Sequence, residues 1–231
     1  MKAINKILAL GLAAGLALMP VGVKADTSAS VAFKNKYLAS SGFLFAEEPV
    51  MQPSLTYFNN SFYGVLGFNV SSEEGLNEVD YIAGFSKDIG ERTNLDVGAG
   101  VFDLRDQGEN DANDNIADAW IKLKRGLTPK TSLEMGVAQN LEGGTFSNPK
   151  GRDWNIALGY KTRMFNLKTD VHYNERYFSP DSGLSVAQVS GNTPFDLGKL
   201  SITPEVLFQK ALDKKNFGDN TMFGVSVSRN F

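Results

Sequence analysis

The stretch TMFGVSVSRNF, residues 221–231, decides the fold class because apolar and polar side chains alternate along it. Phe223, Val225, Val227 and Phe231 fall on one face of an extended strand, and Arg229 is the exception on that face. The residues between them are mostly small or polar. One apolar face and one polar face are typical of a strand in a transmembrane β-barrel.

The same period of two recurs upstream. It is most regular in residues 62–70, 79–85, 95–101, 132–137, 153–161 and 167–174. After residue 25 no segment approaches the roughly 18 consecutive apolar residues of a spanning helix, which excludes a helical membrane protein. The sequence therefore predicts an all-β fold, a transmembrane antiparallel up-and-down β-barrel.

The order of the connections predicts the number of strands. Short turns are expected at residues 59–61, 90–92, 128–130, 163–165 and 198–199. Longer polar loops are expected at residues 40–49, 71–76, 105–115, 141–151, 178–183 and 213–220. Because the two kinds alternate strictly, they predict twelve strands, with ten as the fallback, short periplasmic turns and longer extracellular loops.

Two segments leave the pattern ambiguous. Ile116, Trp120, Leu123 and Leu127 have helical spacing, so residues 115–127 could form an amphipathic helix instead of a strand. Residues 205–215 are similarly ambiguous, and three prolines each remove a ladder donor from a predicted strand: Pro53, Pro194 and Pro204. The alternative fold is a periplasmic sandwich of eight to ten strands with a helix or two.

Aromatic residues gather near the predicted strand ends. Those beside short turns or the C-terminus are Phe58, Phe62, Phe165, Phe195 and Phe231, and those near long loops are Tyr37, Phe178 and Phe217. Barrels carry girdles of such rings at both membrane interfaces. We therefore expect two girdles, which favours the membrane over a soluble sandwich.

Composition excludes several classes of function. The chain has 231 residues, 42% of them apolar, and no cysteine, so disulfides and thiolate chemistry are absent. A formal net charge of −3 gives no electrostatic support for a nucleic-acid partner.

Residues 1–25 are expected to be a cleaved secretory signal peptide, which leaves residues 26–231 as a single barrel domain. Lys2 and Lys6 precede an apolar stretch at 7–21, and Val23-Lys24-Ala25 has the small-x-small pattern of a cleavage site. An uncleaved anchor is the alternative, but the apolar stretch is short for one. The expected location is the outer membrane of a Gram-negative bacterium.

Five motifs follow one another in the first half of the chain. They are 34–42 (KNKYLASSG), 49–57 (PVMQPSLTY), 62–64 (FYG), 78–81 (EVDY) and 95–101 (LDVGAGV). In this order they resemble the TorF-like porin family of proteobacterial outer-membrane barrels. The resemblance implies a barrel with channel activity and supplies no catalytic residue.

The polar face of the predicted strands points into the lumen. It carries eight acidic residues, seven basic residues and one histidine. These selectivity candidates are Lys34, Lys36, Glu78, Asp80, Asp96, Asp118, Lys122, Lys124, Glu134, Asp153, Lys161, Lys168, Asp170, His172, Arg176 and Glu205. So many charges cannot be buried unpaired. They either line an aqueous passage that screens small solutes or pair across the interior and plug it.

Other chemistry finds little support. His172 is the only histidine, so an acid–base mechanism would have to use it, and a hydrogen-bonding role between Asp170 and Asn174 is the simpler interpretation. Residues 111–115 begin like a calcium loop, but Ile116 replaces its glycine and Lys122 its glutamate. Residues 98–100 (GAG) lack the third glycine of a dinucleotide site. We expect no catalytic residue, no metal and no cofactor.

Three functions remain. The first is a porin that allows passive diffusion of small hydrophilic solutes or ions through a charge-lined lumen. The second is a sealed structural or adhesive barrel that acts through its extracellular loops, especially residues 105–115, and the third is an outer-membrane enzyme that uses His172. The expected partners are outer-membrane lipid, small hydrophilic solutes and the barrel-assembly machinery, which would recognise the strand ending in Phe231, with no nucleic acid.

Overall fold

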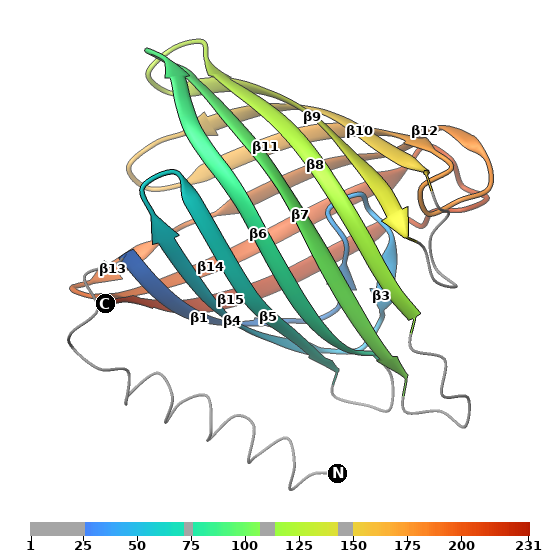
Figure 1. Ribbon diagram of the computed structural model, residues 1–231, viewed down its shortest axis with the longest axis horizontal. Helices are drawn as coiled ribbons and strands as arrows, with labels where there is room; N and C mark the ends of the chain where they lie inside the picture. Colours follow the sequence, from blue (N-terminus) through green and yellow to red (C-terminus); the bar gives the residue numbers. More distant parts are fainter. Residues whose placement is uncertain (1–25, 72–75, 107–113, 143–149) are drawn as a thin grey trace, which may run out of the picture.

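The computed structural model describes residues 26–71, 76–106, 114–142 and 150–231, which form a closed, all-β antiparallel barrel (Figure 1). The predicted signal peptide, residues 1–25, lies outside the described residues, as do the tips of three predicted loops. No helix in the described part is long and apolar enough to cross a membrane.

Twelve strands make the wall, as the order of turns and loops predicts. They are β1 (Asp26–Lys34), β4 (Val50–Asn59), β5 (Phe62–Ser71), β6 (Leu76–Gly90), β7 (Thr93–Asp106), β8 (Asp114–Gly126), β9 (Thr131–Glu142), β10 (Arg152–Lys161), β11 (Asn166–Glu175), β12 (Ser182–Asn192), β14 (Leu200–Ala211) and β15 (Asn220–Asn230). Each pairs with the next, and β1 closes the ring on β15 with Ser28 opposite Asn230. Closure leaves no strand edge in the wall.

Three short strands complete the structure. β2 (Tyr37–Leu38) and β3 (Leu44–Ala46) form a small hairpin between β1 and β4, and β13 (Phe195–Leu197) pairs with β14. β13 follows β12 after a break at Pro194, where the amide of Thr193 donates to the carbonyl of Pro204 at 3.2 Å. Two prolines thus lie at the break between β12 and β13, and the β4–β5 ladder is likewise interrupted around Pro53.

Residues 115–126 belong to a strand and Leu127 follows it, so the helical alternative for residues 115–127 is wrong. β8 pairs with β7 and β9 along its length, with Trp120 opposite Gly98 on one side and Ala138 on the other. Ile121 and Leu123 are exposed on the outer face, while the Trp120 indole donates inward to Asp96 at 2.7 Å. The two-sided ladder satisfies the backbone groups of β8, which explains why local helical spacing does not decide its structure.

The predicted turns and loops fall between the wall strands, and the two kinds lie at opposite ends of the barrel. We call them the turn end and the loop end. Asn60 (φ 56°) and Gly198 (φ 69°) adopt left-handed backbone conformations in two of the tight turns. The amide of Phe231 donates to the carbonyl of Thr27 at 3.0 Å, so the strands at both ends of the described chain meet at the turn end.

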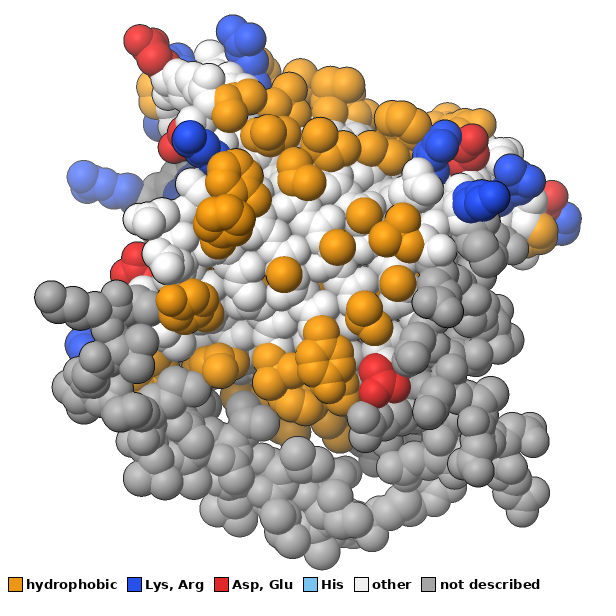
Figure 2. All heavy atoms as spheres, in the orientation of Figure 1, with side chains coloured by type: hydrophobic (Ala, Val, Ile, Leu, Met, Phe, Trp, Pro, Cys, Tyr) orange, Lys and Arg blue, Asp and Glu red, His pale blue; other side chains and the backbone are white. Residues whose placement is uncertain are grey.

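Apolar side chains cover the outside of the barrel. Phe62, Met135 and Leu158 are 64%, 54% and 58% exposed, and Figure 2 shows apolar groups over one face of the wall with charged groups towards its margins. At the turn end Phe165 and Phe195 are also exposed on the outside, as a girdle requires, whereas Phe58 lies opposite Tyr63 in the β4–β5 register, on the inward face where Tyr63 donates a hydrogen bond to Asp96. Such a surface is stable against hydrocarbon and costly in water.

Candidate functional site

The side chains at the alternate, polar positions of each strand point into the lumen. The buried ones come from strands all around the ring: Glu78, Asp118, Asn140, Asp153, Asp170, His172, Gln188 and Gln209. Their apolar neighbours in sequence, such as Ile156 and Tyr173, are exposed outside. The alternation that defines the wall therefore also concentrates charge in its interior.

Most of the sequence-predicted lumenal residues lie on the inward face of a strand. Lys34 pairs with Glu205 at 3.3 Å across the β1–β15–β14 part of the wall, and Asp96 accepts hydrogen bonds from Tyr63 and Trp120. Two of the predicted residues do not lie on strands. Lys36 follows β1 and donates to Asn220 Oδ1 at 3.3 Å, and Arg176 follows β11 with a positive φ of 55° and is exposed. The period of two does not apply to them, because the backbone has left the sheet.

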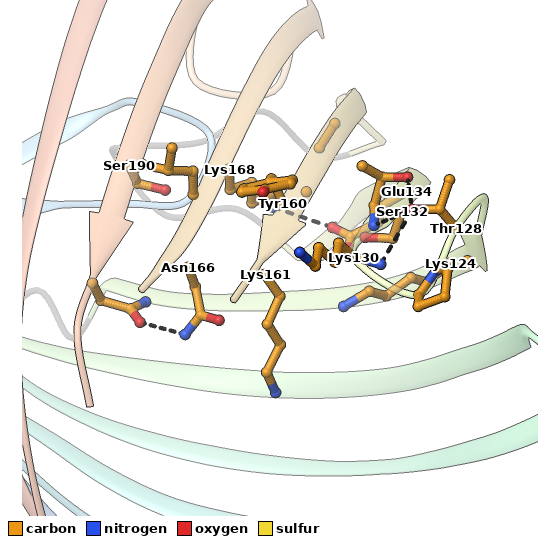
Figure 3. Close-up of a pocket in the computed structure, with 17 residues that line it drawn as sticks. Lys124, Thr128, Lys130, Ser132, Glu134, Tyr160, Lys161, Asn166, Lys168 and Ser190 are labelled. Atoms are coloured by element: carbon orange, nitrogen blue, oxygen red, sulfur yellow. Dashed lines mark hydrogen bonds and ion pairs between the residues drawn. The ribbon is translucent and has the colours of Figure 1, made fainter. Parts of the chain in front are cut away.

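A cavity of about 480 Å³ occupies the turn end of the lumen (Figure 3). Four lysines line it, Lys124, Lys130, Lys161 and Lys168, with Glu134 among them. Lys168 Nζ lies 3.2 Å from Glu134 Oε1 and 3.3 Å from Asp170 Oδ2. The other three lysines are exposed, so the cavity is wet and carries a positive potential.

His172 lies deeper in the lumen between two carboxylates. Its Nδ1 is 2.8 Å from Asp153 Oδ2, and its Nε2 is 3.7 Å from Asp170 Oδ1. Both ring nitrogens therefore face acids, and within the described chain no hydroxyl group hydrogen-bonds to the ring. The histidine is hydrogen-bonded, as the sequence suggests, but its partner is Asp153 of the neighbouring strand; Asn174 instead hydrogen-bonds to the backbone of residues 177, 178 and 181.

The β2–β3 hairpin folds into the loop end of the lumen (Figure 1). On one side the Tyr37 hydroxyl donates to Glu78 Oε1 of β6 at 3.3 Å. On the other side Gln209 Nε2 of β14 donates to the carbonyl of Gly42 at 2.9 Å. Because β6 and β14 lie on opposite sides of the ring, the hairpin spans the lumen and narrows it.

Gly42 is required at the tip of this hairpin. Its φ is +86°, a left-handed conformation, and an added Cβ would lie 2.6 Å from Val186 Cγ2 of β12. Both facts exclude a larger side chain without movement. Val186 itself is fully buried, in a cluster with Ala211 and Phe217.

Aromatic rings hold the hairpin against the β11–β12 loop. Phe178 stacks on Phe43 at 4.9 Å and meets Phe45 edge-on at 5.7 Å, and Tyr177 meets Phe178 at 4.6 Å. Tyr37 stacks on Phe45 at 5.2 Å. We call these five residues the ring cluster. Burial raises the pKa of the Tyr37 and Tyr177 hydroxyl groups well above their ordinary value, with nearby carboxylates adding to the shift.

The ring cluster corrects the prediction of a girdle at the loop end. Tyr37 and Phe178 pack inside the lumen, and Phe217 is 8% exposed beside Val186. Rings near a loop serve as interface anchors only if the loop stays outside, and here residues 37–46 fold inward. The sequence contains a signal for this inward folding, because Leu38, Phe43 and Phe45 make the segment unusually apolar for a loop.

A smaller cavity of about 190 Å³ lies beneath the hairpin. Three predicted lumenal acids line it, Glu78, Asp118 and Asp153. The Tyr177 hydroxyl donates to Asp118 Oδ2. The predicted calcium-like stretch, residues 111–115, falls largely outside the described residues, and the part of the chain that is described contains no group of three or more acids or histidines placed to hold a metal ion.

Comparison with known proteins places the fold among porins. No family model matches the chain, and no curated protein matches its sequence. Among solved structures, the KdgM porin has a TM-score of 0.61 and 11% identity, covering 88% of this chain and 99% of that one. KdgM in complex with disordered oligogalacturonate gives a TM-score of 0.60 at 10% identity, with 88% and 99% coverage. The NanC porin gives 0.55 at 9% identity, with 89% and 100% coverage. At such identities the likeness concerns the fold.

Proposed function

We propose that the chain is an outer-membrane porin that allows passive diffusion of small hydrophilic solutes. The observation that carries this proposal is a closed barrel with an apolar outside, a charged inside and a chain segment folded across one end of the lumen. Inward-facing charges and a local narrowing are the two features from which pores derive solute selectivity.

The proposal includes location and family. An apolar outer surface on a closed barrel suits the outer membrane of a Gram-negative bacterium, and the predicted signal peptide at residues 1–25 would provide export. Membership of the TorF-like family remains a proposal that rests on the five sequence motifs. Insertion through the barrel-assembly machinery, with recognition of the strand that ends in Phe231, is likewise proposed.

We assign the filter to the lumenal charges. Lys168 and Asp170 lie between the two cavities, since Lys168 lines the turn-end cavity and Asp170 reaches towards His172. A solute would pass the lysine-lined cavity, this network and then the narrowing at the hairpin. KdgM has been seen with an acidic oligosaccharide, which supports hydrophilic solutes as the class but does not identify one for this chain.

Current through a planar lipid bilayer tests the proposal. The chain from residue 26 onwards contains the whole barrel and would be refolded and inserted. Discrete conductance steps are expected, and folded insertion without steps would refute the porin function and leave the sealed barrel.

Ion selectivity then tests the filter. Lys168→Glu should shift the reversal potential in a KCl gradient towards cations, whereas Lys199→Glu, in the exposed turn before β14, should leave it nearly unchanged. Equal shifts for the two variants would contradict the assignment of the filter to the lumenal charges.

A further inference from the structure

We propose that the 190 Å³ cavity beneath the β2–β3 hairpin is a binding site for a small organic cation, an alkylammonium group held by carboxylates and aromatic rings. The proposal rests on the proposed function, because the cation would reach the cavity through the lumen, and it adds a solute class to that function.

Three buried carboxylates line the cavity, and each has an oxygen without a partner. Glu78, Asp118 and Asp153 are 3%, 8% and 6% exposed. Glu78 Oε2, Asp118 Oδ1 and Asp153 Oδ1 have no hydrogen-bond partner among the described residues. A buried carboxyl in that situation either takes up a proton or attracts a cation, since an isolated buried charge is costly.

A neighbouring amide shows the same lack of partners. Asn140 of β9 lies opposite Asp118 in the register with β8, and its side chain is fully buried. Neither its Oδ1 nor its Nδ2 has a partner in the described chain. Asn140 does not itself line the cavity. Buried polar groups are normally satisfied, so the unsatisfied oxygens of the three lining carboxylates point to an occupant that supplies donors and charge.

Aromatic rings form another part of the cavity wall. Tyr37, Phe45, Phe102, Tyr177 and Phe178 line the cavity together with the carboxylates and several small or aliphatic residues. Aromatic faces attract alkylammonium groups through their quadrupoles, and the attraction is strongest where water is excluded. A hydrated metal ion would gain little from these rings, whereas an organic cation would be stabilised by the carboxylates and by the aromatic rings.

Basic side chains lie elsewhere in the lumen. The described lining of this cavity contains neither lysine nor arginine, while four lysines line the cavity at the turn end. Lys122, on the same strand as Asp118, does not line the cavity but interacts electrostatically with Asp153, and its Nζ lies 5.9 Å from the centre of the Trp120 ring. Ser40, one of the lining residues, is exposed.

Calorimetric titration with choline and with its uncharged isostere 3,3-dimethylbutan-1-ol tests the site. The refolded chain in detergent should bind choline and bind the alcohol at least tenfold more weakly. Asp118→Asn and Glu78→Gln should each weaken choline binding by about tenfold or more, as expected for a charge contact in a buried site. Glu134→Gln is the matched control, since Glu134 lines the other cavity, and it should leave choline affinity within about twofold.

Equal affinity for choline and the alcohol, or no binding of choline, would overturn the proposal. If a carboxylate variant fails to fold, Phe102→Leu serves instead, because Phe102 of β7 lines the cavity but does not belong to the ring cluster that holds the hairpin; it should weaken choline binding several-fold. Conductance recorded on the same preparations separates the two proposals. A barrel that conducts KCl without binding choline refutes the site alone, and one that binds choline without conducting refutes the porin function alone.

Discussion

Phe178→Ala should release the β2–β3 hairpin from the lumen. Phe178 lies in the β11–β12 loop and touches three other members of the ring cluster, Phe43, Phe45 and Tyr177, at centroid distances of 4.9, 5.7 and 4.6 Å. Two of these partners belong to residues 43–45, in or beside β3. Truncation of the one ring therefore removes the aromatic contacts between the hairpin and the opposing loop.

The size of the effect follows from those contacts. Only the pairs with Phe43 and Phe45 join the hairpin to the loop, because Tyr177 belongs to the same loop as Phe178. Each aromatic pair contributes about 0.5–1.5 kcal/mol beyond area burial, so the two pairs amount to roughly 1–3 kcal/mol. Since 1.4 kcal/mol is a factor of ten, the undocked fraction of the hairpin should rise by about 5- to 150-fold. The hydrogen bond from Gln209 to Gly42 remains in the variant, so docking weakens without being abolished.

Single-channel recording measures this directly. A twelve-stranded barrel with strands about 4.8 Å apart and tilted about 40° has a backbone radius of roughly 12 Å, wide enough that an undocked hairpin should add a distinct level of higher conductance. We expect that level to be rare in the unaltered protein and frequent in Phe178→Ala. The control is Phe62→Ala, which removes a ring paired with Phe85 at 5.2 Å on the outer face. Identical current levels and dwell times in all three proteins would refute the inference that the hairpin limits the pore.

Three further predictions concern other parts of the barrel. A Cβ at Gly98 would overlap the ring of Trp120, so Gly98→Ala should lower the free energy of unfolding by about 1–3 kcal/mol in urea titrations, whereas Gly183→Ala, where nothing lies within 4 Å of the new atom, should cost less than 1 kcal/mol. His172→Ala should keep the conductance steps but destabilise the barrel by about 1–3 kcal/mol, because it leaves Asp153 and Asp170 without the ring between them; loss of conductance with unchanged stability would contradict this. Lys215 lies 2.7 Å from Asp181 and lowers the pKa of that carboxyl, so the pair should stabilise the loop end above the ordinary carboxyl pKa of about 3.9 and lose its effect as the pH falls through the lowered value. Lys215→Met should accordingly speed proteolysis of the β11–β12 loop at pH 7, and an equal rate in both proteins would contradict the contribution of the pair.

The wall of the barrel could be predicted from sequence because its determinants are local. Alternation fixes which side chains face out, as in the stretch Phe223 to Val227, and turn residues such as Asn60 fix where strands reverse. Consecutive strands then pair antiparallel, and the turns leave few alternatives for their register. Even β8, with its helical spacing, became a strand because β7 and β9 flank it.

The interior could not be predicted in the same way. The contact of Gln209 with Gly42 joins residues 167 positions apart, and no periodicity encodes it. Parity gave correct inward faces for Glu78, Asp118 and Asp153, but it could not indicate that a loop would come to lie over them. For Arg176 the parity argument failed because the residue lies beyond the end of its strand.

The two ends of the lumen carry opposite charge for a structural reason. At the turn end, open water can solvate Lys124, Lys130 and Lys161, which are exposed and need no partner. At the loop end the hairpin covers the carboxylates, which are bonded by the hydroxyl groups of Tyr37 and Tyr177 and by the His172 ring. Electrostatic interactions are stronger where water is excluded, so the acids beneath the hairpin should influence ion selectivity more than the exposed lysines, although the candidate acids and bases are nearly equal in number.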